Sequence, residues 1–157
     1  MKQLEMKSFI TEYQLDELSK RDQQLVQMAI EAPNRSYAPY SHFHVGAALE
    51  LTDGRRFMGC NQENAAFPAG LCAERAAIFA AGTECPTTPV ECIAIAARGT
   101  DGHLTEQPVS PCGTCRQVLI ETETRFARPV RILLYGTSKV YAVDSIRQLM
   151  PLSFSEF

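Results

Sequence analysis

Two short stretches, Cys72-Ala73-Glu74-Arg75 and Pro111-Cys112-Gly113-Thr114-Cys115, each begin a segment that is predicted to form a helix. Unpaired backbone N–H groups and the positive end of the helix dipole lie at such a position, and both favour a thiolate. Cys112 and Cys115 share one face of the first helical turn, so both sulfurs can bind one ion. The three cysteines therefore predict a tetrahedral zinc site with its fourth position open to water.

Two charged residues follow the first of these cysteines. Glu74 lies two positions after Cys72, so its carboxylate is expected beside the open position, where it can carry protons to and from a reacting group. Arg75 is expected to hydrogen-bond to the sulfurs and to offset their negative charge. The residues alone predict hydrolytic chemistry without specifying its target.

Other interpretations of the cysteines remain open. The pair Cys112 and Cys115 is also spaced like a dithiol redox site, although that leaves Cys72 and Glu74 unexplained. A structural zinc site needs a fourth ligand. Candidates for it are the remaining thiols and the histidines: Cys60, Cys85, Cys92, His42, His44 and His103. A non-catalytic zinc or dithiol redox protein is thus an alternative.

The composition is that of a globular protein rather than a nucleic-acid or membrane protein. The 157 residues are expected to form one domain, 1–157, with residues 1–15 as an N-terminal extension. A net charge of −3 argues against a nucleic-acid surface, and no apolar run approaches the roughly 18 residues that span a membrane. The N-terminus does not resemble a signal peptide, so the six cysteines are expected to be ligands or free thiols in a cytoplasmic protein.

Predicted helices and strands alternate along the chain around the two motifs, which predicts an α/β fold with a mixed sheet covered by helices on both faces. The predicted helices are 15–32, 72–81 with Gly82 as the C-cap, 112–126, and a short one after Asp144 and Ser145. The predicted strands are 43–51, 55–60, 91–97, 130–135 and 140–143. This is a three-layer α/β/α arrangement with a five-stranded sheet. Residues 9–15 fit either a short strand or the approach to the first helix.

The combination of Cys-Ala-Glu-Arg with Pro-Cys-Gly-Thr-Cys-Arg-Gln resembles the zinc-dependent cytidine deaminase family in its small, homotetrameric form. The likeness extends to Tyr37–Leu49, Gly59–Ala65 and Leu149–Phe154, and so covers residues from about 20 to 154. It implies one Zn²⁺ per subunit, held by the three ligands Cys72, Cys112 and Cys115. It also implies that Glu74 is the proton shuttle and that Arg75 tempers the thiolates.

The same resemblance implies the substrate contacts. Asn61 and Glu63 match a pair that holds the 3′-hydroxyl of a nucleoside sugar, and Phe43 matches an aromatic residue under the pyrimidine. The backbone at Ala73 and Ser110 would hold the base edge and the leaving ammonia. Phe154 matches an aromatic residue that reaches the active site of a neighbouring subunit, which implies a homotetramer with shared sites.

The family resemblance implies hydrolytic deamination of cytidine and deoxycytidine to uridine and deoxyuridine in cytoplasmic pyrimidine salvage, with a small-molecule substrate and no nucleic acid or membrane partner. A deaminase of a modified cytosine nucleoside, of the antibiotic type, is the alternative within the same fold. Phe67 replaces a common tyrosine, Gln62 replaces a common aliphatic residue, and the loop 99–107 is long. These departures bear on substrate preference rather than on the ligands.

Overall fold

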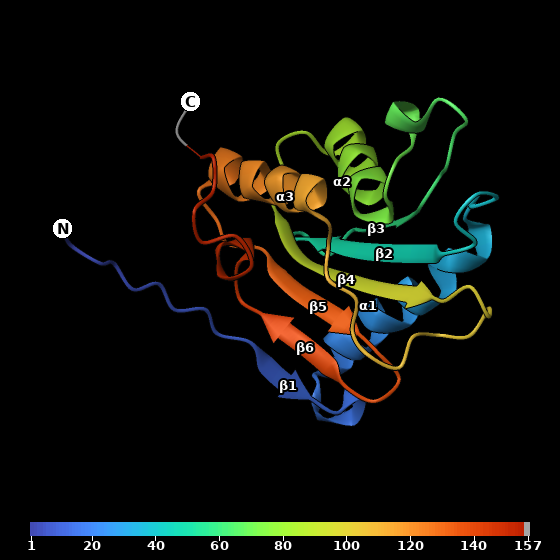
Figure 1. The fold of residues 1–157 in the computed structure, drawn as a ribbon, viewed down its shortest axis with the longest axis horizontal. Helices are drawn as coiled ribbons and strands as arrows, with labels where there is room; N and C mark the ends of the chain where they lie inside the picture. Colours follow the sequence, from blue (N-terminus) through green and yellow to red (C-terminus); the bar gives the residue numbers. More distant parts are fainter. Residues whose placement is uncertain (156–157) are drawn as a thin grey trace.

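The computed structural model describes residues 1–155, which contain six strands and three α-helices (Figure 1). The helices are α1 (Lys20–Glu31), α2 (Ala73–Glu84) and α3 (Gly113–Phe126). The strands are β1 (Thr11–Tyr13), β2 (His44–Leu51), β3 (Arg56–Cys60), β4 (Val90–Arg98), β5 (Arg131–Tyr135) and β6 (Val140–Val143). They form one sheet in the order β1-β6-β5-β4-β2-β3, in which β4 and β5 are parallel and the other pairs antiparallel.

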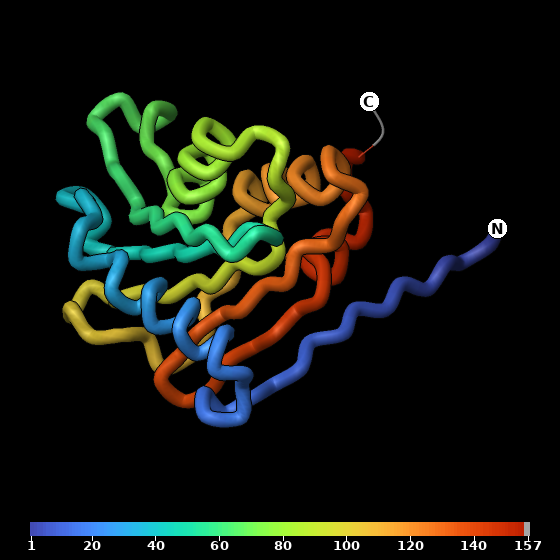
Figure 2. The backbone as a smooth tube through the Cα atoms, turned by 180° about the vertical axis from the view of Figure 1, so that it is seen from behind, coloured from blue at the N-terminus to red at the C-terminus, as the bar shows by residue number. Residues whose placement is uncertain are grey.

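Alternating residues of the central strands separate two cores, one on each face of the sheet. Leu49 on β2 packs with residues of α2 and α3, whereas its neighbour Ala48 packs with residues of α1. Figure 2 shows α1 on one side of the sheet and the other two helices on the opposite side. The predicted three-layer α/β/α fold is confirmed. No helix among the described residues is long and apolar enough to cross a bilayer.

The prediction of five strands is wrong, because β1 adds a sixth at the sheet edge. Thr11 and Tyr13 pair with Ala142 and Val140 of β6, and Lys139 forms an ion pair with Glu12. Three residues are too few to show the alternating pattern that predicts a strand from sequence. The strand forms because it pairs with a partner far along the chain. Residues preceding β1 run away from the sheet as an exposed arm (Figures 1 and 2).

Three predicted helices also differ from the structure, two in a boundary and one in its type. The first helix does not begin at Leu15, because Ser19 accepts a hydrogen bond from the backbone of Asp22 and starts α1 at the next residue. Gly82 does not end α2, which continues to Glu84 with backbone hydrogen bonding up to Cys85. The predicted last helix is one 3₁₀ turn, Ile146–Gln148, capped by Ser145.

A close contact between β3 and α2 positions the first of the two motifs. A Cβ atom on Gly59 would lie 2.3 Å from the backbone oxygen of Ala73 and 2.5 Å from the backbone nitrogen of Ala77. The first turns of α2 therefore lie directly on the edge strand, which a larger residue would prevent. The start of α3 reaches the same end of the sheet through the loop that follows β4 (Figure 1).

Candidate metal and catalytic site

Two helix N-termini meet at a cluster of three sulfur atoms. Cys72 is the N-cap of α2, Cys112 is the N-cap of α3, and Cys115 lies in the first turn of α3. Their Sγ atoms all lie within 4.8 Å of one another, and those of Cys72 and Cys112 are 4.0 Å apart. Thiolates on one tetrahedral zinc ion stand about 3.8 Å apart, given a Zn–S bond of about 2.3 Å. The donor set therefore fits zinc.

The cluster favours ionisation of one thiol. Hydrogen bonding from Cys115 and from the Arg75 guanidinium lowers the pKa of Cys72 to about 5, against the desolvation that burial causes. The pKa of Cys115 is raised in turn, because its proton is held against the Cys72 sulfur. Cys72 is thus a thiolate at neutral pH, which is the form that binds a metal.

Glu74 lies at the start of α2 and is buried, with 4% of its surface exposed. Burial raises the pKa of its carboxyl group, and the Cys72 thiolate raises it further, while a hydrogen bond with Cys115 acts in the opposite direction. A buried carboxyl group whose pKa lies above its ordinary range can exchange a proton with a reacting group more easily near neutral pH. The structure places this group beside the sulfur cluster.

Arg75 lies between the sulfurs and the loop that precedes α2. Its Nη2 atom is 3.6 Å from the Sγ atom of Cys72 and 3.4 Å from the carbonyl oxygen of Gly70. Its Nε atom is buried and has no hydrogen-bond partner within the described part of the chain. The guanidinium group is therefore close enough to offset negative charge on the first sulfur.

A cavity of about 350 Å³ opens beside Cys72 and Arg75. Asn61 and Glu63, which follow β3, also line it, so the structure brings four of the predicted site residues to one cavity. Its volume is at the lower end of the range for small-molecule sites. The cavity also has an aromatic wall: the rings of Tyr40 and Phe67 meet edge to face at 5.7 Å and 81°.

The polar groups of this cavity are tied to the loop before β2. Glu63 accepts hydrogen bonds from the backbone N–H groups of Tyr40 at 2.8 Å and Ser41 at 3.3 Å. Hydrogen bonding from the Ser41 side chain, and then from the Tyr40 backbone, lowers the pKa of Glu63. The Asn61 amide accepts from the Val45 N–H and donates to the Phe43 carbonyl oxygen.

The remaining predicted residues do not line this cavity. Phe43 is half-buried at the start of β2, Ala73 is fully buried in the first turn of α2, and Ser110 is exposed just before the α3 motif. Phe154 is 66% exposed, and its carbonyl oxygen accepts a hydrogen bond from the side chain of Gln117. The pair Tyr40 and Phe67 is absent from the predicted site because no sequence spacing connects the two positions.

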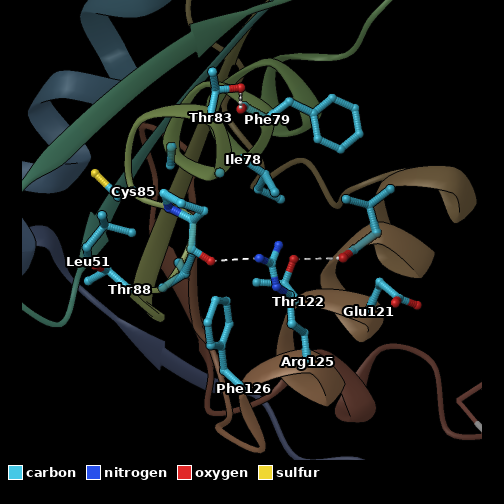
Figure 3. A pocket seen from close by; sticks show the side chains of 15 residues that line it. Leu51, Ile78, Phe79, Thr83, Cys85, Thr88, Glu121, Thr122, Arg125 and Phe126 are labelled. Carbon is cyan, nitrogen blue, oxygen red and sulfur yellow. Dashed lines mark hydrogen bonds between the residues drawn. The ribbon is translucent and has the colours of Figure 1, made fainter.

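A second cavity, of about 340 Å³, lies between α2 and α3 (Figure 3). Apolar side chains such as Ile78, Phe79 and Phe126 line it, and the Arg125 guanidinium crosses it to donate to the Pro86 carbonyl oxygen at 2.6 Å. Neither Glu74 nor any of the three clustered cysteines is among its lining residues. This cavity is therefore separate from the sulfur cluster.

Comparisons with a family model and with individual proteins all point to the same family. The family model for the "Cytidine and deoxycytidylate deaminase zinc-binding region" matches residues 19–128. The chain is 46% identical over 99 residues to a cytidine deaminase of Halalkalibacterium halodurans, which covers 63% of this chain and 70% of that protein. It is 42% identical over 106 residues to a cytidine deaminase of Mycobacterium tuberculosis, covering 66% and 74% of the two chains.

Solved structures show the same similarity over more of the chain. The crystal structure of cytidine deaminase from Burkholderia pseudomallei superposes with a TM-score of 0.72 at 37% identity, covering 83% of this chain and 97% of that one. The Mycobacterium tuberculosis structure superposes with a TM-score of 0.66 at 31% identity, covering 85% and 96%.

Proposed function

Because the chain belongs to the cytidine and deoxycytidylate deaminase family, we propose that it hydrolyses the 4-amino group of cytidine and deoxycytidine. The products are uridine or deoxyuridine and ammonia. The observation that carries this proposal is the burial of Glu74 beside three clustered sulfur atoms, next to a cavity that Asn61 and Glu63 line.

The metal and the carboxylate have separate tasks. Cys72, Cys112 and Cys115 would hold a zinc ion, and when bound it would supply a Lewis acid that makes water nucleophilic at neutral pH. Glu74 accepts one proton from the water that attacks C4 and gives it to N3 of the base. It then passes the second proton, from the hydroxyl group now on C4, to the amino group, which leaves as ammonia as the C4 oxygen becomes a carbonyl. The raised pKa of Glu74 suits both the uptake and the release of a proton. Near neutral pH its protonated and ionised forms are closer in free energy than those of an exposed glutamate. Arg75 limits the negative charge of the sulfurs.

The cavity supplies binding groups for the sugar. Glu63 stays ionised because its pKa is lowered, so it can accept a hydrogen bond from the sugar 3′-hydroxyl, and Asn61 lies beside it. For the base we assign Phe43 to the pyrimidine face and the backbone at Ala73 and Ser110 to its edge and to the leaving ammonia.

We extend the proposal to the assembly and the cellular role, for which the family membership is the support. The exposed Phe154 side chain suits a contact with the active site of a neighbouring subunit, and hence a homotetramer with shared sites. We assign residues 1–157 to one domain that acts in pyrimidine salvage in the cytoplasm.

An absorbance assay tests the proposal. Purified protein should lower the ultraviolet absorbance of cytidine and deoxycytidine but not that of free cytosine, which lacks the sugar. A chelator should abolish the loss, and added zinc should restore it. No change with either nucleoside would overturn the assignment, and a change restricted to a base- or sugar-modified cytosine nucleoside would support the antibiotic-type alternative instead.

A further inference from the structure

The Asn61 side chain makes two hydrogen bonds to the backbone at the start of β2. Its Oδ1 atom accepts from the N–H group of Val45 at 2.8 Å, and its Nδ2 atom donates to the carbonyl oxygen of Phe43 at 2.9 Å. The last regular pair between β2 and β3 is Gly46 with Cys60, so Asn61 extends the pairing beyond the end of the ladder. Its own backbone N–H also donates to the Val45 carbonyl oxygen at 3.1 Å.

The residue before Phe43 adopts an uncommon backbone conformation. His42 has a φ of 53°, in the left-handed region that residues other than glycine rarely adopt. Phe43, the residue just before β2, therefore follows a strained residue directly. A primary amide can donate and accept at once, so Asn61 satisfies one backbone donor and one backbone acceptor on either side of His44. Alanine at position 61 would leave both groups to water.

We propose that Asn61 is a positioning residue for Phe43, fixing the backbone that carries this ring against the base. The inference rests on the proposed function, in which Phe43 contacts the pyrimidine. It is compatible with a sugar contact, because the amide has a second N–H group and the oxygen a second lone pair. Asn61 thus acts on the base half of the nucleoside as well as on the sugar half.

Substrates with and without the 3′-hydroxyl separate the two roles. If Asn61 bound only the sugar, Asn61→Ala would lower kcat/KM for cytidine but not for 3′-deoxycytidine. We expect a loss of about tenfold to persist with 3′-deoxycytidine, as two hydrogen bonds of ordinary strength are removed. Asn34→Ala, an exposed asparagine outside the cavity, is the matched control. A loss that disappears with 3′-deoxycytidine overturns the proposal.

A second measurement asks whether the effect passes through the aromatic ring. In a Phe43→Leu background, the additional loss caused by Asn61→Ala on 3′-deoxycytidine should largely disappear, since the ring that it positions is absent. General destabilisation of the fold would not depend on the Phe43 ring. An equal loss in both backgrounds contradicts the proposal.

Hydrogen exchange gives a readout that does not depend on activity. The Val45 amide should exchange faster in Asn61→Ala than in the wild type, and Asn61→Asp, which keeps an acceptor, should restore most of its protection. Unchanged exchange at Val45 in Asn61→Ala would refute the positioning role. Wild-type protein that deaminates no cytosine nucleoside would instead refute the proposed function, so the two failures are distinguishable.

Discussion

The Sγ atoms of Cys72 and Cys112 lie 4.0 Å apart although 40 positions separate the two residues. Each is the N-cap of a different helix, and each helix is held in place by the sheet beneath it. An ion bound between them therefore connects α2 to α3 directly. Outside the shared core, α2 and α3 make few contacts with each other. Because a bound ion would add a direct connection between them, we expect metal binding and folding to be coupled.

Replacing a ligand tests this coupling. Cys115→Ala should lose most of its zinc and unfold at a lower temperature, because binding to the native state contributes to its stability. Metal analysis and thermal unfolding measure both effects. Cys60→Ala, which alters a half-buried thiol outside the cluster, should keep its zinc. Full zinc content in Cys115→Ala would contradict the assignment of this ligand.

The carboxyl group of Glu74 is predicted to act in proton transfer and not in metal binding. Glu74→Gln keeps the size of the side chain but cannot exchange a proton, so kcat should fall by at least about 100-fold. Zinc content should be unchanged, as measured by metal analysis. Glu84→Gln, at the exposed end of the same helix, should leave turnover unaltered. An active Glu74→Gln enzyme would exclude the proposed mechanism.

Local signals account for the parts of the site that the sequence predicts. The helix starts at Cys72 and Cys112 are visible because helix-forming residues follow each cysteine directly, and both are N-caps in the structure. The alternation of predicted helices and strands along the chain likewise predicts the three layers. These features depend on neighbours within a few positions, so they can be read without knowing the fold.

Features that depend on distant partners are not predictable in this way. Strand β1 exists because it pairs with β6, and the hydrogen bonds of Asn61 reach residues 16 and 18 positions away. Gly82 resembles a helix end, but the backbone hydrogen bonds continue past it. For β1 and Asn61 the deciding contact comes from elsewhere in the fold, and at Gly82 the hydrogen bonding of the helix outweighs a local preference.

The pKa of Glu63 is predicted to depend on Ser41. In the native protein it should titrate below the ordinary value of about 4.3, and Ser41→Ala should move the midpoint upward, as followed by NMR of the carboxyl carbon. A lowered pKa stabilises the native loop above the unfolded pKa, and this contribution is lost as the pH falls through the folded pKa. Ser138→Ala, on the turn between β5 and β6, should have no effect on this titration. An unchanged midpoint in Ser41→Ala would contradict the assigned cause.

A second carboxylate, Glu123 on α3, is predicted to stabilise the fold. It is buried and accepts hydrogen bonds from the backbone N–H groups of Val130 and Ile146, each at 2.9 Å, and from the Ser145 hydroxyl at 2.8 Å. Glu123→Ala should lower the free energy of unfolding by about 2 to 4 kcal/mol, because two N–H donors lose their partner. Chemical denaturation measures this. Glu121→Ala, an exposed change on the same helix, should stay within about 0.5 kcal/mol of the wild type.

Two glycines provide the sharpest test of how α2 is positioned. At Gly59 an added Cβ would lie 2.3 Å from a backbone atom of α2, so Gly59→Ala must push the helix away from β3. We expect lower thermal stability together with weaker zinc retention during dialysis against a chelator, since Cys72 moves with the helix. At Gly82 no atom outside its own helix lies within 4 Å of the added Cβ, and the backbone is helical.

The matched variant Gly82→Ala should therefore stabilise the protein by about 0.5 to 1 kcal/mol, as alanine loses less backbone entropy in a helix, and should retain zinc like the wild type. Lower stability in Gly59→Ala together with higher stability in Gly82→Ala would show that the contact between β3 and α2, and not helix propensity, determines the position of α2. If Gly59→Ala retained zinc as firmly as Gly82→Ala, the edge strand would not determine where the first ligand lies.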